Sequence, residues 1–306
     1  MFAIVRAEVH DLIFGPSNKP DYLALLSIED RTCVRRLHSN VTQAGIATEE
    51  VSNLSNVFEI AGDVSLFGLR AVTDLFRRPF EGDQIRRQLA EVGSKSLPLV
   101  IASGFALGAV LTLHTRSTLV NFGATALIPA VQALAFFLEI GPLVTGLLVA
   151  GRVGSGIGAV LSNMRATEQI DAIESLSIDS FKFLVVPRII ACTLALPLLT
   201  LFLDFSGLLG GYLSEYAASR LSFQLYITQS FSSFEWSNFY PPTLKTAVFG
   251  FIIGTVSCFL GYNTNEGAQG VGRAATRSVV ASSLLIILLD VLLIKFIFFI
   301  FPESAL

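Results

Sequence analysis

The chain has 306 residues, of which 52% are hydrophobic and 15% are charged, and its mean hydropathy is +0.65. Because an ordinary soluble domain carries about 25% charged residues, this composition excludes a soluble protein and predicts an integral membrane protein. The net charge of −3, without a basic stripe bearing interleaved aromatic residues, excludes nucleic acid as a partner.

The N-terminal region, residues 1–50, is mixed in polarity, and we interpret it as a cytosolic extension. It has no continuous apolar run of signal-peptide length and carries Glu8 and Asp11 early, so it resembles neither a signal peptide nor a transit peptide. We therefore expect a bacterial or organelle-encoded chain.

Residues 51–95 are predicted to form an interfacial amphipathic helix region. Apolar residues recur with helical spacing between Val51 and Phe80, while charged residues interrupt any run long enough to span a membrane. A soluble helix packed on the extension is the alternative interpretation.

Residues 96–306 are predicted to form the transmembrane domain. A spanning helix needs about 20 mostly apolar residues, and the segments that come near this length are 96–115, 124–150, 183–213, 247–262 and 279–301. The predicted fold class is therefore an all-α integral membrane protein with an N-terminal interfacial amphipathic helix and five transmembrane helices. A short cytosolic helix is expected between the second and third spans.

The orientation of the chain is predicted from its Lys and Arg residues. Twelve of those flanking the spans lie on one side of the membrane in this topology, and three lie on the other, namely Arg116, Arg220 and Lys245. The positive-inside rule then places the N-terminus and the 163–188 and 263–278 segments in the cytoplasm.

The 163–188 segment is charged, although it lies between two very apolar regions. Thr167 is predicted to cap a short helix, whose acidic face carries Glu168, Asp171 and Glu174. The opposite face carries Ile170, Ile173 and Leu176. Three interpretations are open at this point: a solvated helix without a partner, a docking helix for a cytosolic protein, and paired carboxylates for acid/base work. The last is weak because an exposed helix offers no desolvation.

Glycine pairs four residues apart recur in the apolar regions, and such pairs let membrane helices approach closely. They are Gly104 and Gly108, Gly154 and Gly158, Gly207 and Gly211, and Gly250 and Gly254. The run "GRVGSGIG" resembles a phosphate-binding loop, but no strand precedes it and no P-loop motif occurs in the chain. Helix packing is therefore the preferred interpretation of these glycines.

Ionisable residues inside the predicted spans are costly, so each is a candidate for a functional role. They are Glu139, Asp204, Asp290 and Lys295. Glu139 is the strongest candidate because it precedes Ile140, Gly141 and Pro142, where a kink could open a polar spot in an apolar wall.

Several long motifs, taken together, resemble the MlaE-type permeases, the membrane subunits of ABC transporters that work with MCE-domain lipid-binding proteins. The first is "LEIGPLVTGLLVAGRVGSGIGAVLSNMRATEQIDAIESLSIDSFKFLVVPRIIA", residues 138–191. The others are "LPLLTLFLDFSGLLGGY" at 196–212 and "EGAQGVGRAATRSVV" at 266–280, which precedes a final span containing Asp290. The resemblance covers about 50–302, with Leu138 where many relatives carry Arg.

The resemblance implies a homodimeric permease, without enzymatic activity of its own, in a bacterial inner membrane. It would move phospholipid between that membrane and the outer envelope, with ABC ATPase subunits and an MCE-domain protein as partners. The chain itself would bind no cofactor or metal, because ATP and Mg²⁺ would be held by the ATPase.

The resemblance also implies roles for particular residues. The cytosolic segment after the second span would be the coupling helix that docks on the ATPase, with contacts from Arg165, Thr167, Glu168, Gln169, Asp171 and Glu174. A lipid cavity at the dimer interface would lie beside Glu139, Ile140, Gly141 and Pro142.

Two other classes of protein are alternatives. A membrane-embedded lipid-modifying enzyme would use Glu139 or Asp290, but the sequence places no His, Cys or metal-type cluster near them. An ion-driven secondary transporter would show an internal repeat with matching broken helices, and the sequence shows no such repeat.

Overall fold

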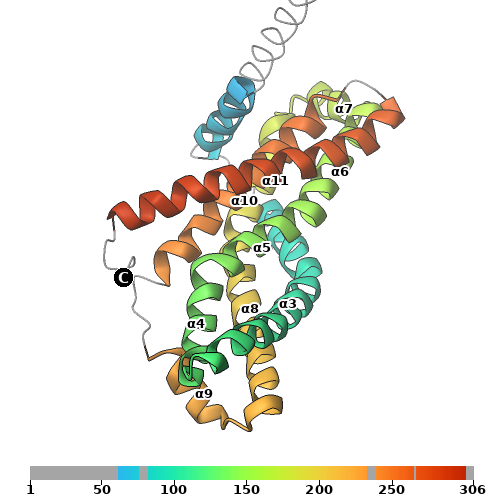
Figure 1. Ribbon diagram of the computed structural model, residues 1–306. Coiled ribbons are helices and arrows are strands. Elements are labelled where there is room, and N and C mark those ends of the chain that lie inside the picture. The colour runs from blue at the N-terminus through green and yellow to red at the C-terminus, as the bar shows by residue number, and fades with distance from the viewer. Residues whose placement is uncertain (1–60, 76–81, 233–238, 265–266, 301–306) are drawn as a thin grey trace, which may run out of the picture. The chain divides into compact units, whose positions relative to one another are not determined.

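The computed structural model describes residues 61–75, 82–232, 239–264 and 267–300, and within these ranges every regular element is a helix (Figure 1). The predicted all-α fold class is therefore confirmed. The predicted cytosolic extension, 1–50, and the first part of the interfacial region lie outside the described residues. Residues 63–306 form one compact unit, and the structure is described within that unit.

Within the described residues, five helical segments are long and apolar enough to cross a membrane, which agrees with the predicted number of spans. The first is α3 (Gly82–Asn121), the third is α8 (Val186–Ser219) preceded by a π-helical turn (Phe181–Val185), the fourth is α10 (Tyr240–Tyr262) and the fifth is α11 (Gly267–Ile300). The second runs from Thr125 to Ala166 through α4 (Ile128–Ala135), α5 (Gly141–Val149) and α6 (Ser155–Ala166), joined by π-helical turns at Phe136–Ile140 and Ala150–Gly154.

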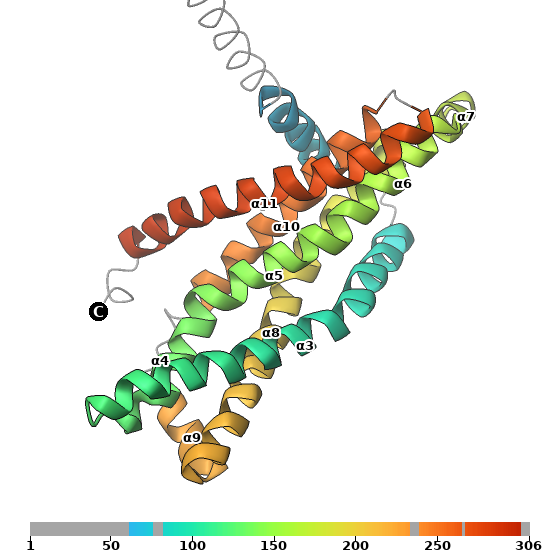
Figure 2. The same ribbon diagram turned by 45° about the vertical axis from the view of Figure 1, so that its right-hand side comes forward.

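Two short helices connect the spans. Between α6 and α8 lies α7 (Gln169–Ser175), and after α8 comes α9 (Phe223–Ser230). The two views show α7 at one end of this unit, beside the first turns of α11, and α9 at the other end, beside α4 (Figures 1 and 2). The Ser222 hydroxyl caps α9 by accepting a hydrogen bond from the Leu225 backbone N–H.

The third span, α8, is the centre of the packing. It packs against both α3 and α10, while α6, α10 and α11 pack against one another. The most apolar stretch of α8 is 67% buried, whereas that of α11 is 17% buried and that of α3 is 28% buried. The outer faces of α3 and α11 are therefore available to lipid or to a second chain.

Glycine brings the backbones of α3, α8 and α10 together. A Cβ on Gly108 would lie 1.9 Å from the carbonyl oxygen of Gly207, and one on Gly250 would lie 2.4 Å from that of Cys192. Atoms of another helix lie within 3.0 Å of such a Cβ at all eight glycines of the predicted pairs. Small residues therefore occupy the positions where these helices lie closest.

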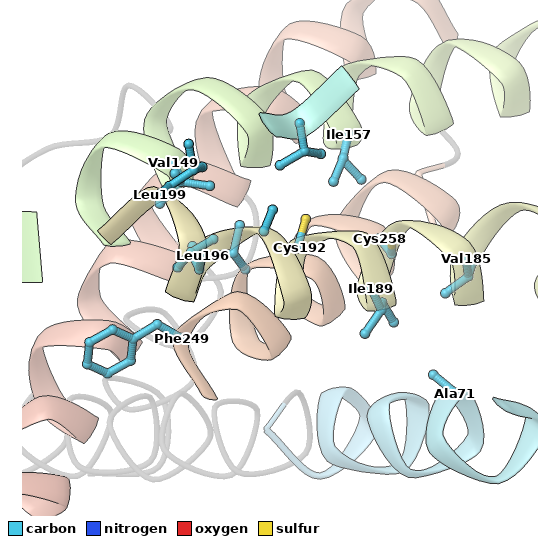
Figure 3. Packing of buried hydrophobic residues seen from close by; sticks show 14 of the residues in the cluster. Ala71, Val149, Ile157, Val185, Ile189, Cys192, Leu196, Leu199, Phe249 and Cys258 are labelled. Carbon is cyan, nitrogen blue, oxygen red and sulfur yellow. The ribbon is translucent and has the colours of Figure 1, made fainter. Parts of the chain in front are cut away.

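Apolar side chains fill the space around the glycine contacts. The cluster runs from Val185 through Leu196 and Leu199 along α8 and includes Phe249 of α10 and Val149 of α5 (Figure 3). Cys192 and Cys258 are fully buried as free thiols, so they serve as small apolar side chains.

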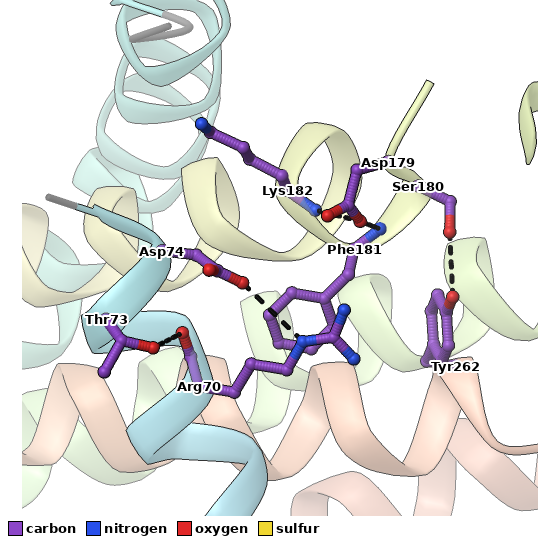
Figure 4. A network of polar contacts seen from close by, with 8 residues as sticks. All are labelled: Arg70, Thr73, Asp74, Asp179, Ser180, Phe181, Lys182 and Tyr262. Atoms are coloured by element: carbon purple, nitrogen blue, oxygen red, sulfur yellow. Dashed lines mark hydrogen bonds and ion pairs between the residues drawn. The ribbon is translucent and has the colours of Figure 1, made fainter. Parts of the chain in front are cut away.

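The described part of the predicted interfacial region is a helix over residues 61–75 and the beginning of α3. The Phe67 ring lies 4.8 Å from that of Phe181 and 5.5 Å from that of Phe259, and the Arg70 guanidinium lies 4.2 Å from the Phe181 ring centre (Figure 4). Leu66 and Leu69 are exposed on this helix. Packing on one side with apolar exposure elsewhere is compatible with an interfacial helix, which stays a prediction.

Candidate functional site

Three charged side chains from three different spans meet inside the helical unit. Lys245, in the second turn of α10, has a side chain that is 2% exposed. Its Nζ donates a hydrogen bond to Glu139 Oε2 at 2.9 Å and forms an ion pair with Asp290 Oδ1 of α11 at 3.0 Å. We call Glu139, Lys245 and Asp290 the charge cluster.

In the charge cluster, each charged side chain has a partner of opposite charge, and without one its burial among apolar helices would cost free energy. An isolated charge in a membrane span is expensive, and pairing offsets much of that cost. With one lysine and two carboxyl groups, the cluster also offers more acceptor than donor capacity. Glu139 is the exposed member, because its side chain is 39% accessible while that of Asp290 is 5% accessible. The cluster is therefore accessible chiefly at Glu139.

The local backbone explains how Glu139 is presented. It lies in the π-helical turn Phe136–Ile140, which is followed directly by Gly141 and Pro142. Pro142 has no backbone N–H, so the hydrogen bond that this group would donate in a regular α-helix is absent. The backbone can therefore widen to a π-helical turn just before it. A π-helical turn therefore lies at the position where the sequence predicted a kink.

Gly141 is required by a close contact on the other side of the same turn. A Cβ at this position would lie 1.7 Å from Asp204 Oδ1. Asp204 is 1% exposed, and neither of its carboxyl oxygens has a hydrogen-bond partner among the described residues. Gly141 and Pro142 are themselves buried, so of the four residues predicted at a lipid cavity, Glu139 and Ile140 are the ones with accessible surface.

Lys245 lies inside the fourth helix, contrary to the prediction from the sequence. The predicted span was 247–262, with Lys245 outside it, whereas α10 begins at Tyr240 and buries this side chain. The signal was present in Tyr240-Pro241-Pro242, because proline is favoured in the first turn of a helix. Lys295 is exposed, and Lys245 is the cation that pairs with Asp290.

A second buried polar group lies near α9, and the sequence analysis did not identify it. Gln132 of α4 is fully buried. Its side-chain oxygen accepts hydrogen bonds from the hydroxyls of Thr112 and Tyr226. Its amide nitrogen donates to the carbonyl oxygens of Gly108 and Gly207, each at 3.3 Å. Burial raises the pKa of the Tyr226 phenol, so it stays protonated and can donate. This group ties α9 to α3, α4 and α8.

The short helix predicted in the charged segment is present as α7, but its cap differs. Thr167 belongs to the end of α6, where its hydroxyl donates to the Asn163 carbonyl oxygen at 2.8 Å. Glu168 occupies the N-cap position with a left-handed backbone (φ 58°) and no capping hydrogen bond from its side chain. The predicted Thr167 cap was therefore wrong.

Contacts attach α7 to three spans. Ile170 is fully buried, and Asp171 pairs with Arg165 of α6 at 2.8 Å. Glu174 accepts hydrogen bonds from Ser180, just before the third span, at 2.5 Å and from Tyr262, the last residue of α10, at 3.2 Å. Ser180 and Tyr262 also bond to each other, as Figure 4 shows.

The residues predicted to contact an ATPase therefore divide into two groups. Arg165, Asp171 and Glu174 bond to side chains of other residues within the chain. The exposed side chains of Glu168 and Gln169 make no described bond, and that of Thr167 bonds only to a carbonyl of its own helix turn. Leu176, predicted on the apolar face, is also exposed. The start of α7 thus offers an accessible surface of polar and acidic groups.

In the part of the chain that the structure describes, no group of three His, Cys, Asp or Glu side chains could hold a metal ion. The charge cluster joins one lysine to two carboxyl groups, and its accessible carboxyl group can accept hydrogen bonds from a polar ligand.

Comparison with known proteins gives a consistent result. The family model described as "Permease MlaE" matches residues 85–296. A probable ABC transporter permease protein of Rickettsia bellii is 41% identical over 237 residues, which cover 78% of this chain and 92% of that protein.

More distant relatives carry more specific names. The intermembrane phospholipid transport system permease protein MlaE of Haemophilus influenzae is 30% identical over 69% of this chain and 82% of that protein. The chloroplastic protein TRIGALACTOSYLDIACYLGLYCEROL 1 of Arabidopsis thaliana is 34% identical over 69% of this chain and 61% of that protein.

Proposed function

The chain belongs to the MlaE permease family and is a membrane permease subunit of an ABC transporter, and we propose on this premise that its cargo is phospholipid. The lipid would move between the inner membrane and the outer envelope. The name of the Haemophilus influenzae relative supports this cargo, and the permease names of the relatives favour a transport subunit over a lipid-modifying enzyme.

We also propose the partners of the subunit. Two copies of the chain would form a homodimer, cytosolic ATPase subunits would hold ATP and Mg²⁺, and an MCE-domain protein would bind the lipid on the outer side. The exposed apolar faces of α3 and α11 support a further chain or lipid at those surfaces. The N-terminus and α7 would face the cytoplasm, in line with the positive-inside rule.

The observation that carries the coupling mechanism is the attachment of α7. A force on its exposed start would reach α6 through Asp171 and Arg165, and the third and fourth spans through Glu174. The buried Ile170 side chain prevents α7 from swinging freely. Closure of an ATPase dimer on α7 would therefore move three spans together.

At the cargo end of the mechanism we propose Glu139 and Ile140 as contacts of the lipid. Glu139 offers an accessible carboxyl group within a span, and Lys245 holds that group in place. Gly141 and Pro142 would act by shaping the turn that presents it, because both are buried.

The first experiment is to purify the tagged chain in mild detergent and identify co-purifying proteins and lipids by mass spectrometry. An ATPase with a P-loop, an MCE-domain protein and bound phospholipid are expected. Recovery of the chain without an ATPase, even after crosslinking at Gln169, would contradict the proposal.

The second experiment tests coupling in the reconstituted complex. Glu168→Lys changes a side chain that makes no described bond, so we expect the variant to fold while lipid transport per ATP hydrolysed falls about tenfold, as for a lost charged contact. The matched control is Asp83→Lys, which makes the same charge change at an exposed position of α3. Equal transport in both variants would remove α7 from the mechanism.

A further inference from the structure

A pocket of about 340 Å³ lies between the end of α10 and the first turns of α11. From α10 it is lined by Phe259, Leu260, Asn263 and Thr264, and from α11 chiefly by Arg273 and Arg277. It lies at the C-terminal end of α10, whereas Lys245 lies in the second turn of that helix. It therefore belongs neither to the charge cluster nor to α7.

The charged side chains described in this pocket are both positive. Arg273 and Arg277 are four residues apart on α11 and so lie on the same helix face. Both are exposed, and the described residues that line the pocket include no Asp or Glu. Two guanidinium groups present several N–H donors in a planar arrangement that matches the oxygens of a phosphate group. The Asn263 amide adds a further donor.

The remaining lining distinguishes a lipid from a small soluble anion. Phe259 and Leu260 are apolar and partly exposed beside the arginines, and both α10 and α11 are long enough to cross a membrane. A headgroup held by the arginines would therefore have apolar helix surface for its attached chains. Basic pockets between membrane helices on a cytoplasmic side are known to suit anionic headgroups.

We propose that the pocket formed by Arg273, Arg277 and Asn263 binds the phosphate group of an anionic phospholipid at the α7 end of the chain. The site would hold a lipid at the junction of α10 and α11, where Tyr262 also contacts Glu174 of α7. A lipid bound there would therefore affect the position of α7 through the hydrogen bond between Tyr262 and Glu174.

The experiment measures retained lipid on the detergent-purified full chain by native mass spectrometry, after incubation with phosphatidylglycerol or with phosphatidylcholine. We expect the Arg273→Gln, Arg277→Gln double variant to retain about tenfold less phosphatidylglycerol than the unaltered chain, with phosphatidylcholine unaffected. The matched control is Arg86→Gln, Arg87→Gln on α3, which removes the same charge elsewhere and should retain phosphatidylglycerol normally. Equal retention in both double variants would overturn the proposal.

A second measurement needs no arginine substitution. On a Cys33→Ser background, Thr264→Cys introduces a partly exposed thiol at the pocket and leaves Arg273, Arg277 and Asn263 in place. Its reaction with a maleimide should slow about tenfold in phosphatidylglycerol but not in phosphatidylcholine. Protection by inorganic phosphate alone, at the same concentration, would overturn the lipid as the source of the phosphate group. Co-purification of the ATPase with the arginine variants tests the proposed function separately, since both arginines belong to α11 and the proposed ATPase contacts belong to α7 and the end of α6.

Discussion

The close approach of α3 and α8 makes Gly108→Ala a sharp test of the packing. The new Cβ would lie 1.9 Å from the Gly207 carbonyl oxygen, whereas ordinary contacts begin at 3.4 Å. The helices would have to separate locally by about 1.5 Å, the difference between these distances. Separation would also stretch the contacts of Gln132, whose amide lies 3.3 Å from the carbonyl oxygens of both glycines.

The cost follows from overpacking in a filled interior. Extra methyl groups in well-packed cores typically cost about 1–3 kcal/mol, against a gain of about 0.5–1 kcal/mol for replacing a helical glycine by alanine. Gly93 provides the matched control on the same helix, because nothing lies within 4 Å of a Cβ there. Gly93→Ala should therefore be neutral or slightly stabilising, and Gly108→Ala clearly destabilising.

The assay uses the buried thiols of Cys192 and Cys258, which are both fully buried and become reactive on unfolding. A maleimide dye that fluoresces on reaction reports the unfolding temperature in detergent, with Cys33→Ser as the background that removes the third thiol. We expect Gly108→Ala to unfold several degrees below Gly93→Ala, at roughly 2–4 °C per kcal/mol. Equal unfolding temperatures would refute backbone contact between α3 and α8.

The same assay tests two further predictions. Lys245→Met leaves Glu139 and Asp290 without their cation and should lower the free energy of unfolding by about 3–5 kcal/mol. Adding Asp290→Asn should recover part of this loss. If the double variant recovered none of it, the ion pair would be contradicted. Gly141→Ala should be strongly destabilising because the new Cβ would overlap the Asp204 carboxyl group. The double variant Gly141→Ala, Asp204→Ala should be more stable than Gly141→Ala alone. Additive effects of the two changes on the free energy of unfolding would contradict the contact.

The number of spans could be predicted from the sequence because hydropathy is a property of local composition. The end of a span is less well defined, and this is where the prediction failed for Lys245. A polar residue at a span boundary can belong to the loop or to the helix, and the choice depends on whether another helix supplies a partner. For Lys245 those partners, Glu139 and Asp290, are 106 and 45 residues away in the sequence.

The charged segment shows the same limit at short range. The spacing of Glu168, Asp171 and Glu174 predicted a helix, and α7 is present. The sequence could not indicate that Glu174 would bond to Tyr262, because this contact depends on how α10 packs. Near Glu139 the sequence likewise predicted a kink at Pro142, but it could not indicate that Asp204 of α8 would lie beside Gly141, directly after the π-helical turn.

The charge cluster also bears on how the chain is inserted into a membrane. The fourth span has the lowest hydropathy of the five, 1.7, and carries Lys245 near its beginning. Glu139 is synthesised before Lys245, whereas Asp290 is synthesised after it, so the lysine has one partner already in place and receives the second with the last span. The fourth span, the least hydrophobic of the five, can thus insert with Lys245 because the second span already carries the negative charge of Glu139.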